Sequence, residues 1–263
     1  MDSIKRNIAE VENIFMETLS IFDNDYTIDS LIEELNRYPY LYRSIAYESA
    51  SYKIGTDSLL KKNDLREWNE YCSKSEKCHR NHIFIGLGWS FAKTNLHPEK
   101  YMDNQLSSAL IHDGMGYYYA LFKGRNTVKK GLVPDDISDN YVSSFLAGVG
   151  RRLWYISKGN LDRLASFLTA FDSNYQQHLW FGIGIASTYV GGITRECIVQ
   201  LINRSANKKS SFIKGVVLGV NARKNENYHT EEMSLISELV LNKNTDEVLN
   251  LIRNDSDLLK YYF

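Results

Sequence analysis

The sequence of 263 residues predicts an all-α fold, a compact array of about six helical hairpins of the HEAT or TPR kind. A short signature, an apolar residue followed by Gly-x-Gly or a weaker variant, recurs along the chain. Three of the steps between copies are 33 or 34 residues long, and the other two are 28 and 40. This spacing suits hairpins that bury their faces by stacking on their neighbours. The leading small residues of the six copies are Ala46, Gly86, Gly114, Gly148, Gly182 and Gly215.

The N-terminal segments carry the apolar spacing of amphipathic helices. Ile4, Ile8 and Val11 recur three and four residues apart, which places them on one helical face. Proline lacks a backbone N–H, so Pro39 ends the second of these segments. The first three helices are expected over residues 4–22, 27–38 and 42–54.

The middle of the chain mixes strong and weak signals. Residues 80–94 form the first strong Gly-x-Gly helix, whereas the polar stretch 64–76 is either a charged helix or a loop. Pro98 suits the first turn of a helix, which we expect to continue to residue 122. Residues 124–139 contain two glycines and a proline and are expected to form a long loop.

The C-terminal half shows clear stop and start signals. Gly191-Gly192 ends one helix, and Thr230 is suited to cap the start of another. Almost no segment alternates with a period of two residues, so β-structure should be minor. Helices are expected over 141–157, 161–171, 175–190, 194–203, 209–223, from Thr230 onward, and over 245–253.

The paired glycines are interpreted as packing sites. A glycine inside a helix costs about 1 kcal/mol relative to alanine, which is tolerable where two backbones approach too closely for a Cβ. The alternative is a phosphate-binding loop, but this needs a preceding strand and the full nucleotide-binding spacing, and neither occurs.

One domain is expected, because no linker rich in Pro, Gly or Ser interrupts the chain. It would span residues 1–263, with a repeat core over 41–225 between helical caps at 1–40 and 226–263.

Composition excludes several classes of partner and places the protein in the cytoplasm. The 31 Lys and Arg are balanced by 32 Asp and Glu, so no basic surface for nucleic acid is expected. Three cysteines do not make a disulfide framework, and they fit a reducing cytoplasm. The N-terminus lacks the apolar core of a signal peptide, and no apolar run is long enough to span a membrane. A homodimer is left open.

Cysteine and histidine residues gather between residues 72 and 82. Cys72, Cys78, His79 and His82 are residue types that bind zinc, but their spacing is not a standard one. The surrounding Lys and Glu indicate a solvated segment. No metal is therefore assigned, with zinc kept as the alternative. The motifs of ATP-binding and Gly-x-Ser-x-Gly enzymes are also missing, so no cofactor is expected.

Several blocks occur in a fixed order along the chain. They are Tyr47-Glu48, Gly86-Leu87-Gly88-Trp89, Asp113-Gly114-Met115-Gly116-Tyr117, Gly148-Val149-Gly150-Arg151-Arg152-Leu153-Trp154, and Leu179-Trp180-Phe181-Gly182-Ile183-Gly184 running to Tyr189-Val190-Gly191-Gly192. Together they resemble the UnbL-like family of domains of unknown function, which accompanies iterative polyketide synthases in enediyne gene clusters. The family has a small residue after Tyr-Glu, and Ser49 stands there in place of the expected glycine. The resemblance implies a role in that kind of pathway, with the synthase or an acyl carrier protein as a partner.

Polar residues carried on the helices are the candidates for chemistry. Glu48 lies in a weakly polar helix, and a buried carboxylate there needs a partner, for which Arg151 or Arg152 is suited. It is interpreted either as half of a structural ion pair or as a general acid or base. Asp113 is either a helix N-cap or, with His112, a proton-transfer unit.

Aromatic residues are abundant, with 18 tyrosines and four tryptophans. They are interpreted either as core or as the wall of a ligand cavity, since tyrosine combines an apolar ring with a polar tip. The residues expected to contact a ligand are Tyr47, Trp89, Tyr117, Tyr118, Trp154 and Trp180.

Three functions are compatible with these features. The first is an accessory protein of specialised metabolism, a cofactor-independent cyclase or isomerase that acts on a hydrophobic polyene by acid–base chemistry. The second is a non-catalytic protein that binds a small molecule or confers self-resistance. The third is a helical scaffold that binds a polyketide synthase. Whether the protein is an enzyme is left open.

Overall fold

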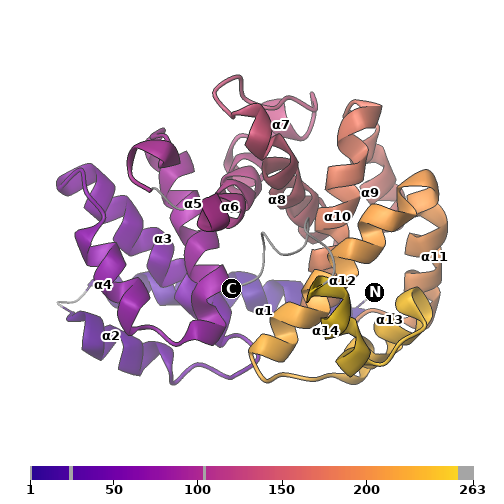
Figure 1. The fold of residues 1–263 in the computed structure, drawn as a ribbon, viewed down its shortest axis with the longest axis horizontal. Helices are drawn as coiled ribbons and strands as arrows, with labels where there is room; N and C mark the ends of the chain where they lie inside the picture. The colour runs from indigo at the N-terminus through magenta and orange to yellow at the C-terminus, as the bar shows by residue number, and fades with distance from the viewer. Residues whose placement is uncertain (1, 24–25, 103–104, 254–263) are drawn as a thin grey trace.

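Six long helices packed side by side form an arch, in which each helix contacts the next (Figure 1). The computed structural model describes residues 2–23, 26–102 and 105–253. These residues contain helices and no strand, so the prediction of an all-α fold is confirmed. The arch consists of α3 (Arg43–Lys61), α5 (Arg80–Thr94), α6 (Gln105–Phe122), α8 (Asp139–Ser157), α10 (Ser173–Val190) and α12 (Lys209–Asn225).

Shorter helices connect the long ones. Among them, α9 begins at an Asn160 cap and α13 at the predicted Thr230 cap, where the side chain accepts a hydrogen bond from a backbone N–H of the first turn. The set comprises α2 (Ile28–Leu35), α4 (Arg66–Lys74), α7 (Gly124–Thr127), α9 (Leu161–Leu168), α11 (Arg195–Ser205), α13 (Glu231–Leu241) and α14 (Thr245–Arg253).

The N-terminal helix α1 (Asp2–Ser20) runs across the arch and contacts both α3 and α10 (Figure 1). Its apolar face, which includes Ile4 and Ile8, is buried. Asn7 donates a hydrogen bond of 3.0 Å to the carbonyl of Val190, which ties α1 to the end of α10. The helix therefore covers one side of the space that the arch encloses.

Paired glycines let the long helices touch backbone to backbone. A Cβ on Gly148 would overlap the carbonyl oxygen of Asp113, the residue just before the paired glycines of α6. A Cβ on Gly182 would meet the carbonyl of Ala147 in the same way. The same contact recurs at Gly114 and at Gly215, so the glycines are packing sites.

This contact corrects the alignment of α3 with the other helices. Gly86 of α5 abuts the carbonyl of Glu48, so Ser49, not Ala46, takes the position of the first glycine in α3. The second position is Ser51, whose hydroxyl donates to the carbonyl of Ile83 at 2.5 Å. Glu48 thus stands one residue before the packing site.

Three local expectations have clear outcomes. Pro98 does not open a long helix, because it begins a 3-10 turn over Pro98–Lys100, and Tyr101 and Met102 after this turn are not helical. The polar stretch at 64–76 is helical, with Trp68 and Tyr71 buried on its inner face. The expected loop over 124–139 holds one short helix, α7.

Candidate functional site

The arch and α1 together enclose a cavity of about 400 Å³. Its wall comes from one face of each long helix, at positions set by the glycine contacts. The residue three places after the first glycine lines the cavity in five successive helices. These residues are Trp89, Tyr117, Arg151, Ile185 and Leu218.

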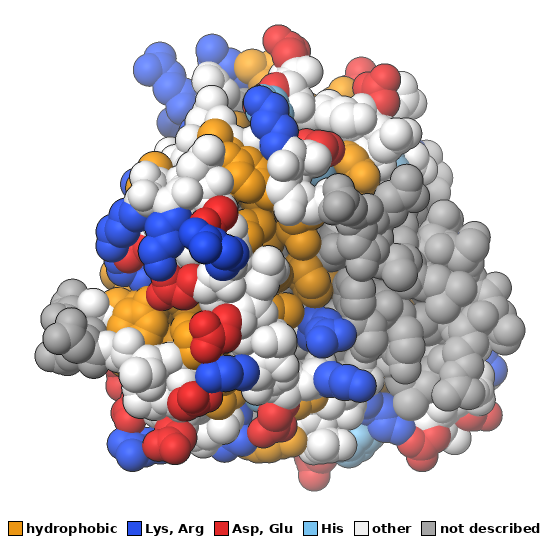
Figure 2. All heavy atoms as spheres, turned by 60° about the vertical axis from the view of Figure 1, so that its left-hand side comes forward, with side chains coloured by type: hydrophobic (Ala, Val, Ile, Leu, Met, Phe, Trp, Pro, Cys, Tyr) orange, Lys and Arg blue, Asp and Glu red, His pale blue; other side chains and the backbone are white. Residues whose placement is uncertain are grey.

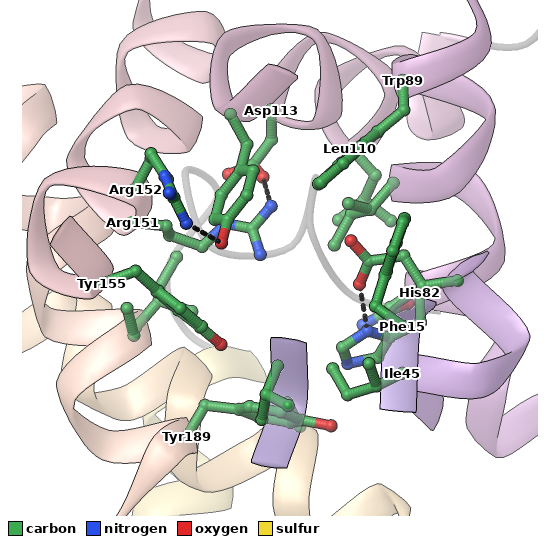
Figure 3. Close-up of a pocket in the computed structure, with 18 of the residues that line it drawn as sticks. Phe15, Ile45, His82, Trp89, Leu110, Asp113, Arg151, Arg152, Tyr155 and Tyr189 are labelled. Carbon is green, nitrogen blue, oxygen red and sulfur yellow. Dashed lines mark hydrogen bonds and ion pairs between the residues drawn. The ribbon is translucent and has the colours of Figure 1, made fainter. Parts of the chain in front are cut away.

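His82 is a buried histidine on one wall of this cavity (Figure 3), and it lies between two carboxylates. His82 Nδ1 is 2.7 Å from Glu48 Oε2, and His82 Nε2 is 3.5 Å from Glu226 Oε1. Each ring nitrogen thus faces a carboxylate oxygen. The side chains of all three residues are less than a tenth exposed, so water contributes little to their solvation.

Arg223 holds the second carboxylate in place and joins the two ends of the arch. Its guanidinium lies 3.1 Å from Glu226 and 3.6 Å above the ring of Tyr189, whose hydroxyl also donates to Glu226. The same guanidinium donates to the carbonyl of Leu41 at 2.7 Å, just before α3 begins. The end of α12 is thereby fixed to the start of α3.

A second ion pair faces the cavity from α6 and α8 (Figure 3). Arg151 donates a short hydrogen bond to the carboxylate of Asp113, and both side chains are buried. Burial raises the pKa of Asp113 to about 6, while the nearby Arg151 acts in the opposite direction. The carboxyl is therefore ionised at pH 7, and it takes up a proton just below that pH.

A third pair ties α1 to the wall. Arg152 lies 3.0 Å from Glu12 of α1 and 3.4 Å from the hydroxyl of Tyr117. Both Arg152 and Arg151 lie near the face of the Tyr117 ring. The cations that line the cavity are thus each matched by a carboxylate.

Trp89 is the centre of an aromatic cluster in the part of the cavity wall that α1, α5 and α6 form. Its ring stacks on Phe15 with a centroid distance of 4.7 Å and on Tyr117 with one of 5.1 Å. Phe122 contacts the edge of the same indole, and Phe122 and Met16 line the cavity while 60% and 65% exposed. These two exposed side chains mark where the cavity reaches the surface.

The family model described as a protein of unknown function, DUF1702, matches residues 1–258. The chain belongs to the DUF1702 family. No curated protein and no solved structure matches the chain. Within the residues described, no helix is both long enough and apolar enough to cross a membrane. Basic and acidic side chains are interspersed over the face of the molecule that Figure 2 shows.

The cavity of this DUF1702 protein contains part of the predicted catalytic set. Glu48, Asp113 and Arg151 all line it. The expected pairing of Glu48 with an arginine is wrong, because Glu48 binds His82 and Arg151 binds Asp113. His112, the expected partner of Asp113, points elsewhere.

The reason for the last correction is the position of His112 on α6. Residues adjacent in a helix point about 100° apart, so His112 and Asp113 do not share a face. The His112 Nδ1–H donates to the carbonyl of Ser108 at 2.7 Å, and the ring stacks on Tyr141 at 4.1 Å. Burial lowers the pKa of His112, while Glu99, 3.4 Å from Nε2, acts in the opposite direction, and none of these contacts involves Asp113.

Of the residues expected to contact a ligand, Trp89 and Tyr117 line the cavity. Trp154 is fully buried, and Trp180 packs edge-on against Phe212, so both belong to the core. Tyr47 and Tyr118 are also buried outside the lining. Tyr47 donates to Asn36, and Tyr118 packs behind Trp89.

Several lining or supporting residues escaped the sequence analysis, namely His82, Tyr155, Tyr189, Arg223 and Glu226. His82 was weighed only as a zinc ligand, although it precedes Gly86 by four residues and so lies on the face that carries Trp89. That spacing was a usable signal. No signal in the sequence indicated Glu226 or Arg223, because Glu226 reaches His82 only through closure of the arch and Arg223 pairs with Glu226.

The four residues weighed as a zinc site do not meet. His82 is turned toward Glu48 and Glu226, and Cys72 is partly buried on α4. Cys78 and His79 do lie together, and the third member of their group is Glu76.

Proposed function

We propose that this protein binds a neutral, largely apolar molecule in the cavity and catalyses a proton transfer on it without a cofactor. Isomerisation or cyclisation of a conjugated polyene is the reaction that suits the cavity best. The observation that carries the proposal is the His82–Glu48 pair, an acid–base group buried in the wall of a mainly apolar cavity.

The charges of the cavity support a neutral ligand. Arg151 is compensated by Asp113, and Arg152 by Glu12. His82 lies between Glu48 and Glu226, and Arg223 offsets the extra carboxylate. An anionic or cationic ligand would leave a charge without a partner in a buried site, which is costly.

The chemistry consists of one proton added and one removed. His82, oriented by Glu48, would donate a proton to one carbon of the polyene, leaving a delocalised carbocation. Asp113, ionised at pH 7, would remove a proton from another carbon as a double bond or ring bond forms. The ring of Tyr155, which also lines the cavity, would stabilise the cation between the two steps.

The origin of the polyene is proposed from the resemblance to enediyne-associated proteins. It implies that the polyene is a polyketide made by an iterative synthase, delivered directly or on an acyl carrier protein. The neighbouring genes would test this context, and a synthase gene beside this one is the expected result.

Reaction in deuterium oxide tests the catalytic proposal. Purified protein is incubated with linear conjugated polyenes, and deuterium uptake is followed by mass spectrometry and bond migration by absorbance. Wild type should incorporate deuterium, and Glu48→Gln should lower the rate by about 10² to 10⁴. Glu12→Gln is the matched control, because Glu12 also lines the cavity but pairs with Arg152 on α8, away from His82. Equal rates in Glu48→Gln and wild type would exclude the proposed role.

A binding protein without catalysis is the second candidate. The observation in its favour is that the acidic and basic groups of the cavity pair with one another. Mass spectrometry of protein purified from its source would then show a bound apolar molecule, unchanged in its double bonds. The Glu48→Gln variant would retain that molecule.

A further inference from the structure

A second polar cluster lies outside the cavity, where α4 connects to α5. The connection is a 3-10 turn over Lys77–His79, preceded by Glu76. One ligand atom each from Glu76, Cys78 and His79 lies within 4.8 Å of the other two. Carboxylate, thiolate and imidazole are the groups that bind zinc in proteins. None of these three residues lines the cavity.

His79 has the environment of a histidine prepared to bind a metal. It is 2% exposed, and its ring stacks on Tyr47 at 4.3 Å. The Nδ1 atom lies 2.7 Å from the hydroxyl of Ser44, while Nε2 is buried without a hydrogen-bond partner. Metal-binding histidines are held in this way, with one ring nitrogen bonded to the protein and the other left for the ion.

The other two groups already have a suitable separation. The sulfur of Cys78 is 3.6 Å from Oε2 of Glu76. Tetrahedral zinc with its usual bond lengths to sulfur and oxygen separates the two ligand atoms by about 3.5 Å. Cys78 is partly exposed and Glu76 is exposed, so an ion can enter from solvent.

We propose that Glu76, Cys78 and His79 bind one divalent ion of the zinc type, with His79 bound through Nε2. Three protein ligands leave a fourth position for water. The ion would fix the turn that begins α5, and His82 lies on the first turn of that helix. The ion would affect the cavity only indirectly, by fixing the helix that carries His82. It would not contact a molecule bound in the cavity.

Cobalt substitution tests the site in the full-length protein. Cobalt(II) bound to a thiolate gives a sulfur-to-metal charge-transfer band in the near ultraviolet, and this band is the readout. Wild type should bind one equivalent of cobalt with this band, and zinc should displace it. Cys78→Ser should abolish the band, and Glu76→Gln should weaken affinity about tenfold or more. Cys72→Ser is the matched control, since Cys72 is a partly buried cysteine outside the cluster, and it should behave as wild type.

Two results would overturn the proposal. One is that wild type shows no charge-transfer band at saturating cobalt. The other is a band that survives in Cys78→Ser or disappears in Cys72→Ser. His79→Gln adds a second measurement: circular dichroism first establishes that the variant is folded, and the folded variant should bind zinc at least tenfold more weakly. Unchanged zinc affinity in folded His79→Gln would also exclude the site.

Discussion

Glu48 and Asp113 occupy equivalent positions on α3 and α6, each one residue before the site where its helix touches the next. The carbonyl of Glu48 abuts Gly86, and that of Asp113 abuts Gly148. In α5, which lies between them, the equivalent residue is Ile85. One packing arrangement thus presents two carboxylates to the same cavity, each with a different partner.

The backbone contact predicts that Gly148→Ala strongly destabilises the protein. The new Cβ would overlap the backbone of α6 at Asp113, and backbone cannot move aside as a side chain can. A loss of about 1–3 kcal/mol or more in the free energy of unfolding is expected. Urea denaturation measures it. Gly124→Ala is the control, because its Cβ would meet only Val128 at 3.8 Å and should change stability by less than about 1 kcal/mol.

The raised pKa of Asp113 predicts a pH effect on stability. The folded-state value of about 6 lies above the reference value of 3.8, so the folded protein holds the proton more tightly. This contribution favours folding at low pH and is lost as the pH rises through 6. Between pH 5 and pH 7 the loss is about 1 kcal/mol.

Urea denaturation of wild type and Asp113→Asn at both pH values isolates that effect. The variant cannot ionise at this position, so its change in stability between pH 5 and pH 7 should be smaller than that of wild type. Identical pH dependence in the two proteins would show that Asp113 titrates at the same pH in the folded and unfolded chains.

Arg223 is predicted to be essential for closure of the arch. In Arg223→Met, Glu226 would be buried without its cation, and α12 would lose its bond to Leu41. A loss of about 3–5 kcal/mol in stability is expected from thermal or urea unfolding. Adding Glu226→Leu should recover much of it, since the unpaired charge is then removed.

An exposed pair offers the comparison for this experiment. Arg204 pairs with Asp162 at the surface, so Arg204→Met should change stability by less than about 1 kcal/mol. If Arg223→Met were equally mild, the buried pair would not hold the arch closed.

Two tryptophans that look alike in sequence should differ in function. Trp89 lines the cavity, whereas Trp180 packs in the core against Phe212. Trp89→Ala should weaken the binding of a fluorescent polyene at least tenfold. Trp180→Ala should lower stability by about 3–5 kcal/mol and leave the affinity of the folded protein unchanged. Equal affinities in the two variants would argue against a ligand at Trp89.

The periodicity of the sequence was enough to predict the all-α class of the fold. Gly86, Gly148 and Gly182 lie within apolar helices, where glycine is unfavourable unless a neighbouring backbone takes the place of the Cβ. That local argument predicts both the helices and the close contacts between them. The same argument misplaced the packing site within α3 at Ala46, because Ser49 takes the place of the first glycine there.

The candidate site was only partly predictable. Glu48, Asp113 and Arg151 are visible in the sequence as polar residues in apolar helices, but the pairing of Arg151 with Asp113 is not, and neither is His82 as the partner of Glu48. The one inferred from adjacency, His112 with Asp113, is wrong, because neighbouring residues in a helix point in different directions. The partners of Glu48 and Asp113 lie on the next long helix, 34 and 38 residues along the chain.

The sequence by itself therefore determined the helices, their close packing and the burial of Glu48, Asp113 and Arg151, since these follow from local periodicity and from the cost of glycine and of buried charge. Only the tertiary structure decided which charges meet. Curvature of the arch brings Glu226 and Arg223 of the last long helix to His82 and Leu41 near the first. That closure depends on the summed angles between six helices, which no local pattern of residues specifies.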